Sequence, residues 1–348
     1  MKWNIVLYSV NVNAINNATQ AHFLQMNVHD TFCSQRMDMG YEIEFFPVGD
    51  ASKAGDAISV RFGSNGNYRV IIIDGGTDDA GETIVNHVRE VYGVNTIVSD
   101  VISTHPDSDH ACGLRTVLQE LPVERLWVHG LWHHASEILN LFENANWTVQ
   151  GLSKAIKDEY PVIGELFDIA AKYNIPVYEP FAGANIGPFT VLSPNKATYQ
   201  HLIPQFRKTP APNSDLLKAR SIWLATQKNS LFSQFLTKAS DTVADWISES
   251  WNIELLREGG VTAAENESSV VLFGDFEGRK VLLTADSGVN ALNWACDNAT
   301  GLGLDVSGTE FIQVPHHGSR RNVSPSTLDR IIGPKLPLGT AITKSAAV

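Results

Sequence analysis

The sequence predicts an α/β fold with a single core, and three features support this prediction. Strand-like and helix-like segments alternate along most of the chain, and several strands are continuous runs of β-branched residues. No internal repeat and no Pro-, Gly- or Ser-rich linker divides the chain into independent units. With 348 residues, of which 43% are apolar, the chain is long enough to bury a sizeable core.

Composition excludes several classes of protein. A formal net charge of -12 argues against a broad, nonspecific grip on nucleic-acid backbones, which needs a surplus of Lys and Arg. Cys33, Cys112 and Cys296 are odd in number and far apart, so neither a disulfide framework nor a CxxC zinc site is supported. No apolar run approaches the ~20 residues that cross a bilayer. We therefore expect a cytoplasmic protein without a membrane partner.

The first half of the chain predicts the start of the sheet. Residues 1–36 are Asn-rich and weakly patterned, and we expect an ill-ordered extension before a domain at 37–348. The elements that follow are strands at 41–49, 56–63 and 68–76, a helix at 80–93 and a strand at 97–105.

The alternation continues after residue 105. The predicted helices cover 113–122, 135–145 and 151–174, and the predicted strands cover 124–130, 175–180 and 187–194. Residues 195–260 lack strand signals and predict a mostly helical insertion. Strands return within 268–286 and 309–319.

The segment "STHPDSDHACG" carries the clearest chemical signal. His105, Asp107, Asp109 and His110 directly follow a predicted strand, where α/β sheets place ligand chemistry. Imidazole nitrogens and carboxylate oxygens suit Zn²⁺, Mn²⁺ or Fe. A polar turn is the structural alternative, because Asp and Pro also mark turns.

Two later strands end in similar residues. "VLLTADSG" ends on Asp286, and "FIQVPHHGS" ends on His316 and His317. A single such residue is often a cap or a surface turn. Three separate strands that all end in ligand-competent residues favour one shared metal site.

These motifs, together with "GDAISVRF", "VIIIDGG", "GPFTVLSP" and "NESSVVLF", resemble the metallo-β-lactamase superfamily. The resemblance is to the hydrolase domain of bacterial DNA-uptake (competence) channel proteins in particular, and it covers about residues 41–332 apart from the insertion. It implies an αββα sandwich with two divalent metal ions, Zn or Mn, at the sheet edges.

The resemblance also implies roles for individual residues. One ion would be bound by His105 and Asp107, and the other by Asp109 and His110. Asp286 would bridge them, and His317 would be the late histidine ligand. Asp109 would also orient the attacking water, which makes it a catalytic residue as well as a ligand.

The same resemblance leaves His316 either beside the ligands or as a group that transfers a proton. The sequence departs from the usual pattern at Asp107, where many members have His, and this oxygen ligand makes Mn²⁺ a competitor of Zn²⁺. Where many members carry a further ligand His, the nearest polar residues are Asn266 and Ser269.

The expected function is metal-dependent hydrolysis, as a phosphodiesterase or nuclease with a small-molecule or nucleic-acid substrate. One alternative is hydrolysis of a lactam, lactone or thioester, because fold does not fix function. The other is a non-catalytic metal-binding protein. Relatives usually continue past "HHGS" through another strand, so the resemblance also implies that the C-terminal end is truncated.

Further polar residues have two interpretations each. Asp74, before two glycines, either accepts a hydrogen bond from a ligand histidine or only forms a turn. His129, His133 and His134 either line the mouth of the site or lie on the surface at a helix start, and the surface interpretation is favoured.

Overall fold

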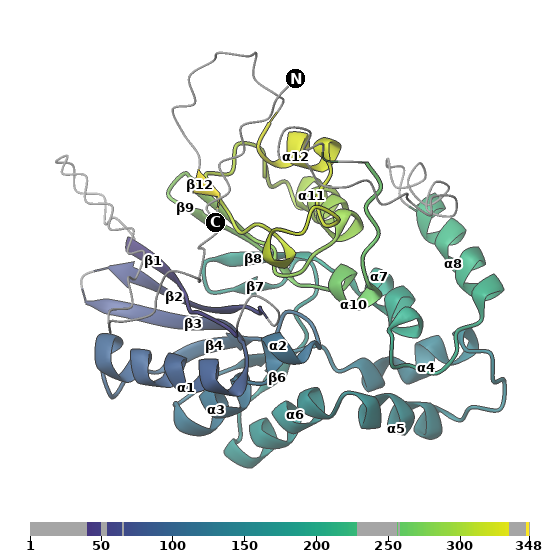
Figure 1. The fold of residues 1–348 in the computed structure, drawn as a ribbon, viewed down its shortest axis with the longest axis horizontal. Helices are drawn as coiled ribbons and strands as arrows, with labels where there is room; N and C mark the ends of the chain where they lie inside the picture. The colour runs from purple at the N-terminus through teal and green to yellow at the C-terminus, as the bar shows by residue number, and fades with distance from the viewer. Residues whose placement is uncertain are drawn as a thin grey trace.

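The computed structural model describes residues 40–49, 54–64, 66–227, 256, 258–333 and 346–347. These residues form two six-stranded sheets with helices outside them (Figure 1). The predicted N-terminal extension at 1–36 lies outside the described residues.

The first sheet has the strand order β1-β2-β3-β4-β5-β6. Its strands are β1 (Gly40–Phe45), β2 (Ala57–Ser64), β3 (Asn67–Gly75), β4 (Val98–Ile102), β5 (Leu126–Trp127) and β6 (Val177–Tyr178). β1, β2 and β3 pair antiparallel, whereas β3 to β6 pair in parallel. The start of β2 and the ends of β3 and β4 therefore meet at the same edge of the sheet.

The second sheet has the order β12-β11-β10-β9-β8-β7. Its strands are β7 (Asn185–Ile186), β8 (Phe189–Ser193), β9 (Val271–Phe276), β10 (Arg279–Leu283), β11 (Phe311–Ile312) and β12 (Ala346–Ala347). β7 to β10 are antiparallel, and β10, β11 and β12 are parallel. The ends of β10 and β11 thus share one edge.

Helices cover the outer face of each sheet, as Figure 1 shows. The first sheet is covered by α1 (Asp78–His87) with the π-helical turn η2 (Val88–Tyr92), and by α3 (Leu114–Glu120) and α6 (Pro161–Tyr173). α5 (Val149–Glu159) packs beside α6. The second sheet is covered by α11 (Val289–Gly301) and α12 (Pro325–Ile331).

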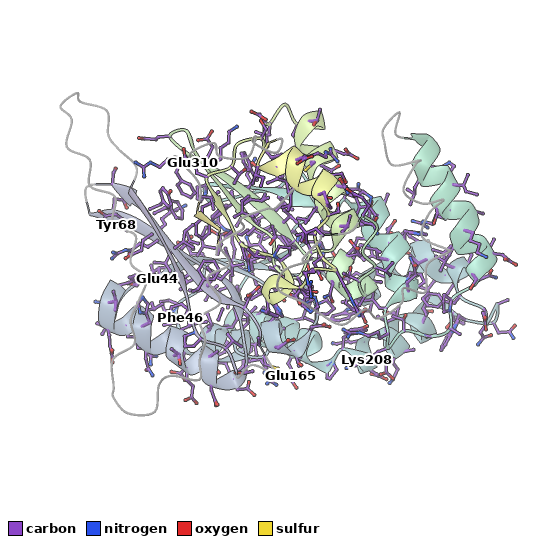
Figure 2. All side chains as sticks on the ribbon, turned by 45° about the horizontal axis from the view of Figure 1, so that its top comes forward. Glu44, Phe46, Tyr68, Glu165, Lys208 and Glu310 are labelled. Carbon is purple, nitrogen blue, oxygen red and sulfur yellow. The ribbon has the colours of Figure 1, made fainter. Side chains whose placement is uncertain are left out.

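Alternation along β3 shows how the layers are built. Val70 and Ile72 are buried against the helices of the first sheet, while Ile71 and Ile73 are buried against the second sheet. Successive side chains of a strand point to opposite faces, so one β-branched run serves both layers. Side chains fill the space between the two sheets (Figure 2). The predicted αββα sandwich is confirmed.

Short elements connect these layers. They are α2 (Ser108–Ala111), η3 (Leu131–His134), α4 (Ala135–Ile138), η4 (Leu139–Leu141), α7 (Lys196–Leu202), η5 (Ile203–Gln205), α8 (Ser214–Gln227), α10 (Ala264–Glu267) and η6 (His316–Gly318). Within the predicted insertion, α7, η5 and α8 are helical, and 228–255 lie outside the described residues.

The structure differs from the predicted elements in a few places. The helix expected at 151–174 is two helices, because Pro161 lacks an amide hydrogen and begins α6. α11 was not predicted, since asparagines interrupt its apolar pattern. β12, which the expected truncation left out, pairs with β11. Among the described residues, no helix combines the length and apolarity needed to cross a membrane.

Candidate metal centre

The loop of "STHPDSDHACG" is held against two neighbouring strands by close backbone approaches. A Cβ on Gly55 would lie 1.9 Å from the Asp109 carbonyl oxygen, so only glycine fits beside the loop there. A Cβ on Gly113 would lie 2.0 Å from the Gly75 carbonyl oxygen. These contacts place α2, which begins at Ser108 just after β4, over the ends of the strands.

Asp286 lies between two pairs of histidines. Its Oδ2 is 3.8 Å from His105 Nε2 and 3.6 Å from His316 Nε2. Its Oδ1 is 3.4 Å from His110 Nε2 and 3.8 Å from His317 Nε2. Each oxygen therefore faces its own pair of imidazole nitrogens, which divides the cluster into two halves.

The central atoms of this cluster lack ordinary partners. His105 Nε2, His110 Nε2 and Asp286 Oδ1 are buried and have no hydrogen-bond partner in the described part of the chain. A buried polar atom without a partner costs free energy, on the order of 1–3 kcal/mol. Two imidazole nitrogens and a carboxylate oxygen that converge in this way match the donor set of a transition-metal site. The residues thus fit divalent metal ions.

Asp74 and Thr104 orient the two buried histidines. Asp74 Oδ2 accepts a hydrogen bond from His110 Nδ1 at 2.8 Å and from the Thr104 hydroxyl at 2.6 Å. Thr104 Oγ1 also lies 3.0 Å from His105 Nδ1. With Nδ1 so engaged, both rings present Nε2 to Asp286. The hydrogen-bonded interpretation of Asp74 is the one that the structure shows.

His316 is oriented in a similar way. Its Nδ1 lies 3.1 Å from Asn322 Oδ1 and 3.4 Å from Asn266 Nδ2, which leaves Nε2 directed at Asp286. Asn322 also donates to the carbonyl oxygens of Asp286 and Ser287. His316 therefore faces Asp286 as directly as His317 does, and Asn266 lies beside its Nδ1.

Asp109 and His317 lie in the half of the cluster that contains His110. Each of these three residues offers one ligand atom, and the three atoms lie within 4.8 Å of one another. The side chain of His317 is 26% exposed and that of His316 is 39% exposed. The cluster therefore opens to solvent on the η6 side.

Asp56 is a site residue that sequence reasoning missed. Its Oδ2 lies 3.9 Å from His110 Nδ1, and its Oδ1 lies 4.0 Å from His317 Nδ1. It forms a ligand-competent group with His110 and Asp286. Gln313 donates to Asp56 Oδ2 at 2.7 Å. The Gly-Asp pair directly before β2 could have indicated Asp56 as a site residue, because the start of β2 lies at the same edge as the end of β3.

Electrostatics within the cluster are strongly coupled. Burial raises the pKa of Asp56 to about 7, and the charges of Asp286 and Asp74 add to this effect. Burial alone would lower the pKa of His110, but the nearby carboxylates of Asp286 and Asp74 raise it well above its ordinary value. The pKa of His105 is lowered by burial and by the charge of His110. Bound cations would compensate the negative charge gathered here.

Asp107 lies at the rim of the cluster and has a second partner. Its Oδ2 is 4.0 Å from His105 Nε2. Both of its oxygens accept hydrogen bonds from Arg207 Nη2, at 2.8 and 2.7 Å. The structure therefore brings Asp107 beside His105, and it adds Arg207, which sequence reasoning missed.

The surface interpretation of the histidines after β5 was wrong for two of the three. His129 is 5% exposed and His134 is 2% exposed, whereas His133 is exposed. His134 Nε2 lies 3.0 Å from Glu179 Oε1. His129 stacks on Tyr199 with ring centroids 4.2 Å apart. Both side chains are buried because they pack against Tyr199, and His134 also pairs with Glu179.

Comparisons with known proteins give only distant similarities. No protein-family model matches the sequence. No curated protein matches it either.

Solved structures that resemble the fold include metallo-beta-lactamases. A candidate metallo-beta-lactamase of Thermotoga maritima is 12% identical with a TM-score of 0.32, covering 72% of this chain and 79% of that one. The hydrolase AbOPH of the beta lactamase superfamily is 13% identical with a TM-score of 0.36, covering 77% and 75%. A metallo beta lactamase from Hirschia baltica is 11% identical with a TM-score of 0.29, covering 78% and 84%. At these values the likeness concerns the fold alone.

Proposed function

We propose that the protein is a metal-dependent hydrolase that cleaves phosphodiesters, as a phosphodiesterase or nuclease. The observation that carries the proposal is the position of Asp286, with one carboxylate oxygen facing each pair of histidines. A carboxylate in this position suits a bridge between two ions. The likeness of the motifs to the hydrolase domain of DNA-uptake proteins supports the choice of substrate.

The proposed ligand sets follow the two halves of the cluster. The first half has His105, Asp107 and Asp286 Oδ2 as ligands, and His316 Nε2, which faces the same oxygen, is left free to transfer a proton. The second half contains Asp286 Oδ1 and the following residues: Asp56, Asp109, His110 and His317. Two divalent ions held there would supply water activation near neutral pH and charge neutralisation at the attacking and leaving oxygens.

The chain's own groups would then position and protonate the substrate. Asp109, at the open side of the second half, would orient the attacking water by accepting a hydrogen bond from it. The side chain of His316 is more exposed than those of the other three histidines around Asp286. Held at Nδ1 by Asn322, it would pass a proton from Nε2 to the leaving oxygen.

Manganese is the first metal to test. The proposed ligands include the carboxylates of Asp56, Asp107, Asp109 and Asp286. Sites rich in oxygen ligands suit Mn²⁺, whereas Zn²⁺ more often has softer nitrogen and sulfur ligands.

The test combines turnover with metal content. Metal-loaded protein is assayed with bis(p-nitrophenyl) phosphate and single-stranded DNA, and in parallel with nitrocefin, a lactone and a thioester. We expect cleavage of the phosphodiesters with Mn²⁺ or Zn²⁺, and about two ions per chain. Turnover of only the carbonyl substrates would replace the proposed substrate class. Fewer than about one bound ion after reconstitution would favour a non-catalytic protein.

Asp109→Ala is the matched variant for the site assignment. We expect it to lose part of the bound metal, because Asp109 lies with His110 and His317 in the second half. Equal metal content in Asp109→Ala and wild type would remove Asp109 from the ligand set.

A further inference from the structure

Arg207 connects the predicted helical insertion to the first half of the metal centre. It follows η5 (Ile203–Gln205), within the range 195–260 that the sequence predicts as an insertion. Its Nη2 contacts both oxygens of Asp107, at 2.8 and 2.7 Å. Figure 2 labels the next residue, Lys208, near the helices of this region.

Arg207 is itself held from the other side. Its Nε donates to Glu265 Oε1 at 3.1 Å, and its backbone amide donates to the same oxygen at 2.6 Å. Glu265 is 1% exposed, and it also accepts a hydrogen bond from the Tyr160 hydroxyl. The guanidinium therefore bridges a buried carboxylate and the carboxylate beside His105.

This arrangement has two possible effects on a cation beside Asp107. The positive charge of Arg207 would repel the cation, while its hydrogen bonds would hold the Asp107 carboxylate in place. The second effect should dominate, because the negative charge of Glu265 offsets the positive charge of Arg207 and leaves a nearly neutral pair. The repulsion is then small, whereas the orientation of Asp107 remains.

We propose that Arg207 is a positioning residue that holds Asp107 for the first metal ion. The inference rests on the proposed metal centre and deepens it. It also gives the segment after η5 a role in the site, because Arg207 in that segment fixes the orientation of Asp107 in the loop after β4. Partners of metal ligands commonly contribute about 10- to 100-fold to metal affinity.

The experiment is a calorimetric titration of metal-free protein with Mn²⁺. Arg207→Ala would leave Glu265 buried without its cation and could fail to fold, so the main variant is the double substitution Arg207→Met with Glu265→Gln. It removes both charges and keeps similar volumes. We expect one of the two ions to bind about 10- to 100-fold more weakly and the other to bind as in wild type.

Two further measurements separate positioning from general damage. Arg330→Met is the control, because Arg330 also pairs with a carboxylate, Asp297, but does so between α12 and α11 on the outside of the second sheet. This variant should bind Mn²⁺ as wild type does. In an Asp107→Asn background, the double substitution should weaken Mn²⁺ binding no further.

The outcomes are distinct. Unchanged or tighter Mn²⁺ binding in the double variant would overturn the role of Arg207. So would a loss of Mn²⁺ affinity that is as large in the Asp107→Asn background as in wild type, because Asp107 would then not be involved. If wild type itself binds no Mn²⁺ or Zn²⁺, the proposed metal centre fails instead.

Discussion

His110 donates a hydrogen bond from Nδ1 to Asp74 Oδ2 across 2.8 Å, and this contact joins the end of β3 to the loop after β4. Asp74 also accepts from the backbone amide and the hydroxyl of Thr104. Asp74→Asn would turn an amide NH₂ toward one of these donors. We expect metal affinity to fall about 10- to 100-fold and the free energy of unfolding to fall by about 1–3 kcal/mol.

Metal titration and chemical denaturation of Asp74→Asn check this expectation. Asp305→Asn serves as the control, because Asp305 is exposed and its hydrogen-bond partners among the described residues are Ser307 and Lys280. If Asp74→Asn and Asp305→Asn bind metal equally well, Asp74 does not orient His110 in a way that matters for binding.

Asp286→Asn should affect both ions at once. The side chain faces His105 and His316 through one oxygen and His110 and His317 through the other. A neutral amide has one poor ligand atom, so we expect both ions to bind more weakly and phosphodiester turnover to fall by at least about 100-fold. Elemental analysis and the assay with bis(p-nitrophenyl) phosphate measure the two effects. Loss of a single ion with the other unchanged would contradict a bridging position.

Gly55→Ala should displace the metal-binding loop at Asp109, whose backbone and Cβ both lie against Gly55. The new Cβ would lie 1.9 Å from the Asp109 carbonyl oxygen, so the backbone must shift, at a cost of about 1–3 kcal/mol. We expect weaker metal binding together with a lower melting temperature. Gly301→Ala is the control, since a Cβ there meets nothing within 4 Å. Wild-type metal affinity in Gly55→Ala would show that the loop tolerates the shift.

Glu267 should make stability depend on pH in a defined direction. Burial raises its pKa to about 7, although hydrogen bonds from Ala291, Thr262 and Asn290 oppose the shift. The folded state therefore favours the protonated carboxyl. The stability it contributes is fully present below the ordinary pKa near 4.5 and is lost as pH rises to about 7.

Glu267→Gln removes this titration and keeps the shape of the side chain. We expect the free energy of unfolding of the variant, relative to wild type, to increase by about 3 kcal/mol between pH 4.5 and pH 8. Parallel urea denaturation series across this range measure the difference. A constant difference at all pH values would mean that Glu267 titrates normally in the folded protein.

Much of the fold and part of the site could be predicted from sequence because they depend on local patterns. The run at 68–76 alternates between two buried faces, and His105, His110 and Asp286 follow strands directly. β4 and β10 lie in different sheets, and their carboxyl ends meet because the two sheets pack face to face.

Other site residues could not be predicted by that reasoning. Asp56 precedes its strand, and it reaches the site only because β2 runs antiparallel to β3. Arg207 contacts Asp107 across 100 positions of sequence, with no local pattern to indicate it. The burial of His129 depends on packing against Tyr199, which tertiary contacts decide.

The hydrogen bond from Gln313 to Asp56 spans 257 positions of the chain. Gln313 also accepts from the amides of Thr284 and Ala285, so it ties the end of the second sheet to the start of β2. Contacts this far apart form only after the intervening chain has been brought together, and such contacts slow folding. During refolding, uptake of metal at this cluster should therefore lag behind the appearance of helical structure and report the final docking of the two sheets.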